Sequence, residues 1–358
     1  MHILFLAGSL GQGGAERQLF YILKTLKAQG ADVSLACLTK GDFWEEPIKQ
    51  LGVPVYWVGG NKNHFIRLAK IIALARKNKS TIIQSHHFFT NAYSTIAARV
   101  IGIRDIGAIR SDAINEVRAN GNIFGNFCLH APGQLAANSK AGIDNAVKKG
   151  VPSQRLYFLP NVVESEHFSP SVKTSNKPLV FLTVGSLIRP KRHDLFIECF
   201  SRVKAETRLN IQGWIVGEGP LQKSIEAKIN ILEMENENLK LFKKVADPLS
   251  FYNQADIFLL TSDFEGTPNV VMEAMSCGLP VIATRTGGTS DLIKDGETGY
   301  LVNPGDIEDI VMHLHLLLEK PELRMKLGTA ARQFIVDHYS INQLPMMLEE
   351  FYNSIYRS

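Results

Sequence analysis

The chain has 358 residues, a length that favours two domains over one. With 45% hydrophobic and 21% charged residues its composition is globular, and no apolar run is long enough to span a membrane. The net charge of +4 is uneven: residues 1–160 hold 19 Lys and Arg against 9 Asp and Glu, and residues 161–358 hold 20 against 26. The basic first half suggests an anionic membrane face or a phosphate-linked acceptor, unless it is ordinary solvated charge.

The cysteines and the first residues indicate where the protein works. Cys37, Cys128, Cys199 and Cys277 lie far apart and lack metal-binding spacing, so we expect reduced, packed thiols in a cytoplasmic protein. Residues 2–7 are apolar, have no cationic segment before them and run into a glycine-rich loop. They predict a first strand and not a signal peptide.

The first half alternates apolar strand patterns with amphipathic helix patterns. Strands are expected at 2–7, 33–38, 54–58, 81–85, 106–110 and 135–138. Helices are expected after the glycine loop and at 65–77, 91–101 and 123–130, and residues 138–141 are expected to open another. Such alternation predicts a parallel sheet with right-handed crossovers. Ligands of these sheets bind at the carboxyl ends of the strands.

Three candidate sites follow strands of the first half. The loop Gly13-Gly14-Ala15-Glu16 lets a ligand approach the backbone closely, but it lacks the glycine spacing of a dinucleotide-binding loop. The pair His86-His87 and the residue Asp112 follow two other strands. The alternatives are a tight strand-to-helix turn for the glycines and a structural role for either histidine.

A polar linker is expected at 164–177, and the second half repeats the alternation. Its strands are expected at 178–185, 211–216, 239–242, 256–260, 279–283 and 300–302, and from Asp306 the chain is expected to be helical, with breaks near 321 and 339–340. The segment from Gly185 to Arg192 places Arg189, Lys191 and Arg192 directly after a strand. Cations at a helix start oppose the helix dipole, so a diphosphate ligand is a better explanation than a solvated surface.

The most informative stretch is Ser262–Met275, which follows the strand at 256–260. We expect Thr267 as the N-cap and Pro268 as the first residue of a helix whose free N–H groups bind an anion. Glu265 and Glu273 flank this point, and carboxylates that only accept hydrogen bonds suit sugar or ribose hydroxyls. The alternative is a purely structural role, as an ordinary strand–loop–helix unit with acidic residues near a helix start.

The ordered set of motifs resembles the retaining nucleotide-sugar glycosyltransferases of glycosyltransferase family 4 (group 1). The segment from Glu265 to Glu273 resembles the family's E-x7-E element, and the glycine loops at 13–14, 217–219 and 287–288 and the turn at 295–299 match in order. The resemblance implies a GT-B fold of class α/β, with two Rossmann-like parallel-sheet domains facing each other across a cleft. It implies an N-terminal acceptor-binding domain at 1–165, a nucleotide-sugar-binding domain at 175–338 and a C-terminal helix at 339–358 that crosses back to the N-terminal domain.

The resemblance also implies roles for individual residues. Glu265, His86, Arg189 and Lys191 are the expected catalytic residues, the two cations neutralising the diphosphate while His86 and Glu265 position the sugar. Glu273 is expected to hold the nucleotide ribose. The expected substrate-binding set is Gly13, Gly14, Glu16, Asp112, Gly185, Ser186, Gly266, Thr267, Pro268, Asn269, Val270 and Glu273.

The sequence departs from the family pattern at two places. Ser186 stands where the family often has an arginine, so either Arg189 or Arg192 is expected to replace that charge. The strand end that carries a second histidine in many relatives reads Arg110-Ser111-Asp112, and the roles of Arg110 and Asp112 are left open.

We therefore predict a metal-independent, retaining transfer of a hexose from a nucleotide sugar, a UDP-sugar such as UDP-glucose by default, to a sugar or lipid-linked acceptor in surface or exopolysaccharide assembly. We expect no cofactor and no nucleic acid. We do expect peripheral contact with the inner face of the plasma membrane. The alternatives are a nucleotide-sugar epimerase of the same fold, a non-catalytic nucleotide-sugar-binding protein, or a metal-dependent transferase that uses Asp263 and Glu265 as a D-x-E pair.

Overall fold

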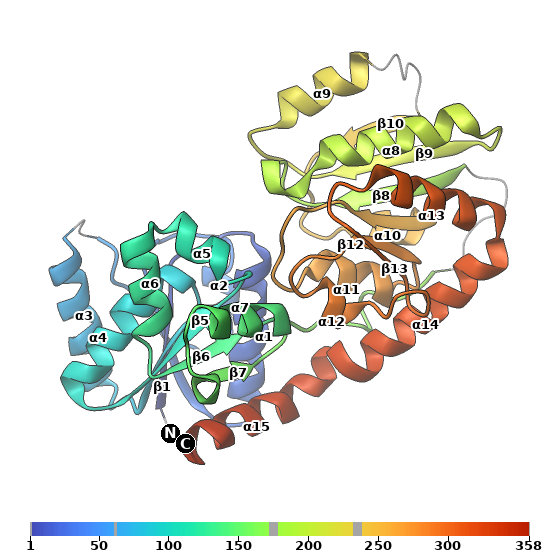
Figure 1. Ribbon diagram of the computed structural model, residues 1–358. Coiled ribbons are helices and arrows are strands. Elements are labelled where there is room, and N and C mark those ends of the chain that lie inside the picture. Colours follow the sequence, from blue (N-terminus) through green and yellow to red (C-terminus); the bar gives the residue numbers. More distant parts are fainter. Residues whose placement is uncertain (1, 61–62, 172–177, 232–237, 358) are drawn as a thin grey trace. The chain divides into compact units, whose positions relative to one another are not determined.

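The structure is a computed structural model that describes residues 2–60, 63–171, 178–231 and 238–357 (Figure 1). The chain forms two compact units. The first comprises residues 1–161 together with 342–358, and the second comprises residues 162–341. The change of unit after Asn161 precedes the expected linker, because Phe168 is buried in the core of the second unit.

The first unit is built on a seven-stranded parallel sheet with the order β3-β2-β1-β4-β5-β6-β7. Its strands are β1 His2–Ala7, β2 Asp32–Cys37, β3 Val55–Trp57, β4 Ile82–Ser85, β5 Arg104–Ile109, β6 Gln134–Ala137 and β7 Leu156–Phe158. Its helices are α1 Gly14–Ala28, α2 Glu45–Gln50, α3 His64–Lys77, α4 Asn91–Ile101, α5 Ile114–Ala119, α6 Asn122–His130, α7 Lys140–Lys148 and α15 Leu344–Arg357. In the middle of the sheet β1 and β4 are fully buried and β5 is buried after its first residue, as the apolar runs predict.

The C-terminal helix α15 belongs to the first unit. It packs against α1, and the buried hydroxyl of Tyr352 donates a hydrogen bond to Oε1 of Gln84 on β4 at 2.6 Å. The helix therefore completes a domain whose other residues lie more than 180 residues earlier in the chain.

The second unit contains a six-stranded parallel sheet with the order β10-β9-β8-β11-β12-β13. Its strands are β8 Leu179–Val184, β9 Ile211–Val216, β10 Leu239–Phe242, β11 Ile257–Leu260, β12 Val281–Thr284 and β13 Tyr300–Val302. Its helices are α8 His193–Glu206, α9 Gln222–Ile231, α10 Leu249–Gln254, α11 Asn269–Ser276, α12 Thr289–Leu292, α13 Ile307–Glu319 and α14 Pro321–Tyr339. Apolar clusters cover both faces of this sheet.

The α/β prediction with two parallel sheets is confirmed, and the differences are local. Five elements were not predicted, because their sequence patterns are too short or too weakly periodic: β7, α2, α5, α9 and α10. The predicted N-cap at Thr267 and helix start at Pro268 were wrong by one residue: α11 begins at Asn269, and Pro268 with extended backbone (φ −74°, ψ 111°) is its N-cap residue. Among the described residues, no helix combines the length and the apolar character needed to cross a bilayer.

Candidate active site

In each sheet the strand order reverses beside the first strand, and this reversal is where ligands bind in doubly wound folds. In the second unit the reversal lies between β8 and β11, which are direct neighbours. The carboxyl end of β8 leads into Gly185 and Ser186, and that of β11 leads into Ser262 and Glu265. The topology therefore brings together the two motifs that the sequence analysis singled out.

Lys191 and Glu265 form an ion pair at this edge. The ammonium Nζ of Lys191 lies 2.6 Å from Oε1 of Glu265, and the hydroxyl of Ser262 donates to the same carboxylate oxygen at 2.7 Å. The predicted diphosphate cation and the predicted sugar-contacting carboxylate thus hold each other, and Ser262 fixes the rotamer of Glu265.

Glu273 lies in the second turn of α11 and is buried, with 1% of its surface exposed. Its Oε2 accepts a hydrogen bond from the hydroxyl of Tyr252 at 2.7 Å. A buried carboxylate requires hydrogen-bond donors, and Tyr252 supplies one that the sequence analysis did not foresee. In the sequence Tyr252 is a tyrosine near the end of a short helix, and this feature is too common to predict a role at the site.

The loop at Gly287-Gly288 supports the segment that carries Glu265. The amide of Gly288 donates to the carbonyl of Gly266 at 2.7 Å. Gly287 has a left-handed conformation (φ 49°), and a Cβ atom there would lie 1.9 Å from the carbonyl oxygen of Glu265. Only glycine allows this approach of the two backbones.

The two arginines that could replace the charge absent at Ser186 differ in their surroundings. Arg192 pairs with Asp194 (Nε–Oδ1 3.2 Å) and with Asp263 (Nη1–Oδ1 3.1 Å). The side chain of Arg189 makes no hydrogen bond or ion pair with any residue in the described ranges. Arg189 is therefore the cation that an incoming anion meets without breaking an existing pair.

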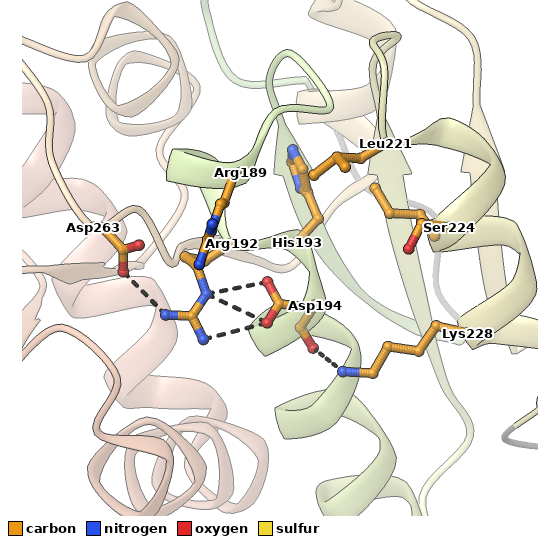
Figure 2. A pocket seen from close by; sticks show the side chains of 9 residues that line it. Arg189, Arg192, His193, Asp194, Leu221, Ser224, Lys228 and Asp263 are labelled. Atoms are coloured by element: carbon orange, nitrogen blue, oxygen red, sulfur yellow. Dashed lines mark hydrogen bonds and ion pairs between the residues drawn. The ribbon is translucent and has the colours of Figure 1, made fainter. Parts of the chain in front are cut away.

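Both arginines line a cavity of about 450 Å³ between the start of α8 and the helix α9, which Figure 2 shows from close by. The Nζ atom of Lys228 on α9 donates a hydrogen bond to the backbone carbonyl of Asp194, and both residues line this cavity (Figure 2). His193 lies in the wall, and burial lowers its pKa to about 4, so the ring is neutral and its Nε2–H donates to the carbonyl of Ser186. The backbone of Ser186 thus holds a histidine, while its exposed side chain adds no charge.

Asp263 and Glu265, the carboxylates of the D-x-E alternative, each bind a cation. Asp263 pairs with Arg192 and Glu265 with Lys191. Within the described part of the chain, no group of three or more His, Cys, Asp or Glu side chains is arranged to hold a metal ion.

The strand order of the first unit reverses between β1 and β4. The loop after β1 contains Gly13, the N-cap of α1, and Gly14, its first residue. The amide of Gly8 donates to Nδ1 of His87, so the ring Nε2–H of His87 faces Oε1 of Glu16 at 3.3 Å. Burial alone would raise the pKa of Glu16, but hydrogen bonds from His87 and Ser9 outweigh it and lower the pKa.

His86 is fully buried beside this loop. Its Nε2–H donates to the carbonyl of Ala15 at 2.6 Å, and its Nδ1 accepts from the guanidinium Nη2 of Arg110 at 3.1 Å. Burial and the charge of Arg110 hold the pKa of His86 well below its ordinary value, so the ring is neutral. His86 therefore links the glycine loop to Arg110.

The residues after β5 have roles that the sequence left open. Arg110 is half-buried, and the desolvation of its guanidinium lowers its pKa to about 10, while its amide donates to Oε1 of Glu116 on α5 at 3.0 Å. Burial raises the pKa of Glu116 to about 7. The carboxylate of Asp112 accepts hydrogen bonds of 2.6 Å from both the backbone amide and the side-chain amide of Asn115. Asp112 therefore stabilises the turn at the start of α5. The sequence analysis missed Glu116, because it lies in a helix too short to be recognised.

Two Rossmann-like parallel-sheet units, each with polar motifs at its reversal point, define the GT-B class of glycosyltransferases. Residues 12–167 match the family model described as Glycosyltransferase Family 4, and residues 164–334 match Glycosyl transferases group 1. Together the two models cover residues 12–334. The chain therefore belongs to the group 1 glycosyltransferases of family 4, and it is a glycosyltransferase.

The similarity to several known proteins extends over most of the chain. A capsular polysaccharide biosynthesis glycosyltransferase of Staphylococcus aureus, CapM, is 25% identical over 80% of both chains. The Campylobacter jejuni N-acetylgalactosamine-N,N'-diacetylbacillosaminyl-diphospho-undecaprenol 4-alpha-N-acetylgalactosaminyltransferase is 26% identical over 91% of this chain and 93% of its own. The structure of Anabaena Alr3699/HepE in complex with UDP-glucose superposes with a TM-score of 0.86 at 19% identity, over 99% of this chain and all of the other, which shows the fold.

Proposed function

We propose that the protein transfers a hexose from a UDP-sugar to a lipid-linked saccharide acceptor during the assembly of a surface polysaccharide, at the inner face of the plasma membrane. The observation that carries the proposal is the arrangement at the reversal point of the second sheet. There Lys191, from the loop after β8, pairs with Glu265, from the loop between β11 and α11.

The charged residues at this edge of the sheet suggest how the nucleotide-sugar donor binds. The diphosphate binds the amide groups at the start of α11 and the free guanidinium of Arg189, and it takes over Lys191 from Glu265. Glu265 then accepts from hydroxyls of the sugar, and Glu273 accepts from the ribose while Tyr252 holds its other oxygen.

The transfer proceeds as a front-side displacement with retention at the anomeric carbon and without metal. The bond between that carbon and the diphosphate oxygen breaks while the bond to the acceptor oxygen forms, and the departing phosphate oxygen takes the acceptor proton. Lys191 and Arg189 stabilise the negative charge that develops on the leaving group. Trapping of a covalent glycosyl-enzyme, or loss of activity in excess EDTA, would contradict this mechanism.

The names of similar proteins support the choice of substrates. The Campylobacter relative acts on a diphospho-undecaprenol-linked saccharide, CapM serves capsular polysaccharide biosynthesis, and the Anabaena structure contains UDP-glucose. The excess of Lys and Arg in residues 1–160 suits an acceptor that carries a diphosphate.

The deciding experiment is calorimetric titration of the protein with UDP-, GDP- and ADP-sugars without metal, repeated with Glu273→Gln. Glutamine keeps an acceptor for Tyr252 but accepts ribose hydroxyls less strongly, so we expect UDP-sugar affinity to fall about tenfold. The matched control Glu319→Gln on α13 should bind like the wild type.

Failure of every donor to bind would refute the proposal. Conversion of the donor sugar without an acceptor would indicate an epimerase, and binding without turnover for any acceptor would indicate a binding protein.

A further inference from the structure

Four large apolar side chains of the first unit are exposed at the starts of two helices. Phe65 and Ile66 begin α3, and Ile123 and Phe124 begin α6. Phe65 is 81% exposed and Ile123 is 92% exposed, although phenylalanine and isoleucine are among the residues most often buried. We call these four residues the apolar rim.

The fold places both helix starts at one edge of the sheet. Helix α3 follows β3 and α6 leads into β6, so both begin at the edge where the parallel strands end. Both helices pack against α4, which puts them in one layer on one face of the sheet (Figure 1). The glycine loop, His86 and Arg110 follow strands at this same edge. The apolar rim therefore borders the region expected to receive the acceptor.

Neither helix of the apolar rim carries an acidic residue. Helix α3 contains Arg67, Lys70, Arg76 and Lys77 and no Asp or Glu, and α6 contains no Asp, Glu, Lys or Arg. Lys70 on α3 and Arg118 on α5 are exposed, and neither has an ion-pair partner within the described residues. The acidic residues of the α5 region are engaged, Asp112 by Asn115 and Glu116 by Arg110.

We propose that the apolar rim inserts into an anionic lipid bilayer, with Lys70 and Arg118 contacting lipid phosphates. Exposed apolar side chains on two helices without acidic residues, with unpaired cations nearby, match the boundary between acyl chains and anionic headgroups. The core of a protein interface is instead depleted in lysine, so a protein partner fits this surface less well. The inference rests on the proposed function in that a lipid-linked acceptor gives the bilayer its role.

The test is co-sedimentation of the full chain with vesicles of phosphatidylcholine alone and of phosphatidylcholine with phosphatidylglycerol. The wild type should bind the anionic vesicles, and Phe65→Ser/Ile123→Ser should lower the partition coefficient at least about tenfold. Lys70→Glu should lower binding to the anionic vesicles and leave binding to neutral ones unchanged. Because these side chains are exposed, the thermal unfolding midpoints should match that of the wild type.

Matched controls lie on α14 of the second unit. Met325 is 71% exposed and Lys326 is exposed, so Met325→Ser and Lys326→Glu make the same chemical changes away from the apolar rim. Both should bind vesicles like the wild type, and an equal loss of binding in them would overturn the proposal. A dimer in sedimentation velocity that Phe65→Ser abolishes would also overturn it, by making a second copy of the chain the occupant.

The two proposals fail separately. A wild type that binds a UDP-sugar but no anionic vesicle would remove the docking surface and leave the donor function intact. A wild type that binds vesicles through the apolar rim but no nucleotide sugar would remove the proposed function and leave the docking surface.

Discussion

Lys191 and Glu265, which are 74 residues apart in the chain, are joined by an ion pair of 2.6 Å at the carboxyl edge of the second sheet. This pair neutralises a nearly buried carboxylate until a ligand arrives. A diphosphate offers Lys191 more negative charge than Glu265 does, so we expect donor binding to exchange one partner of Lys191 for the other. The relationship makes Lys191 the first residue to test.

Replacing Lys191 with Ala should lower the transfer rate at least about a hundredfold, because the leaving diphosphate loses a preorganised cation. The affinity for UDP should fall less, since the helix amides and Arg189 remain. Steady-state kinetics and titration with UDP separate the two effects. Arg202→Ala, which removes an exposed pair with Glu308, is the control and should leave both quantities unchanged. A Lys191→Ala variant with an unchanged rate would exclude the role proposed for this lysine.

Arg189, and not Arg192, should supply the charge that Ser186 lacks. Because the side chain of Arg189 has no partner within the described residues, Arg189→Ala should weaken UDP-sugar binding about tenfold. Arg192→Ala should change the affinity less than about twofold, because its guanidinium already binds Asp194 and Asp263 in exposed pairs. Titration of both variants with the same UDP-sugar makes the comparison, and the opposite order of effects would reassign the role to Arg192.

Gly287→Ala should destabilise the second unit and weaken donor binding. The new Cβ would meet the carbonyl oxygen of Glu265 at 1.9 Å, so the Glu265 segment must move. We expect a loss of about 3 kcal/mol, from left-handed strain and overpacking together. Gly305→Ala has the same kind of backbone (φ 82°) with nothing within 4 Å, so it should cost only about 1 kcal/mol and leave binding intact. Equal unfolding free energies in urea for the two variants would show that the predicted clash does not occur.

The stability of the first unit should depend on pH through Glu116. Burial raises its pKa from 4.5 to about 7, so between these values the folded state binds a proton that the unfolded state releases. Stability from this group therefore falls as pH rises from 4.5 to 7, by at most about 3 kcal/mol. Glu116→Gln should remove this loss, so the stability difference between the variant and the wild type should grow over that pH range.

The measurement can be restricted to the first unit. Of the three tryptophans, Trp44 and Trp57 lie in the first unit and Trp214 in the second. In a Trp214→Phe background, tryptophan fluorescence during urea unfolding reports the first unit alone. Glu46→Gln on α2 is the control for an exposed glutamate. A difference that stays constant with pH would mean that folding does not raise the pKa of Glu116.

The sequence alone predicts most of the architecture because its signals are local. Continuous apolar runs such as residues 3–7 and 257–260 predict buried parallel strands, and the glycines and Pro268 mark turns between neighbouring elements. The E-x7-E motif lies within a single strand–loop–helix unit, so its residues can be read without knowledge of the rest of the fold. Short elements such as α5 and β7 carry too few residues to establish a period.

What only the tertiary structure decides is which side chains meet across the chain. The pairing of Lys191 with Glu265, of Tyr252 with Glu273 and of Arg110 with His86 depends on the strand order, which places distant loops at one edge. The same holds for Tyr352 and Gln84, 268 residues apart, since nothing in either local sequence specifies its partner. Local sequence patterns determine where strands, helices and turns form, but hydrogen bonds and ion pairs between distant residues form only once the packed sheets bring them within a few ångströms.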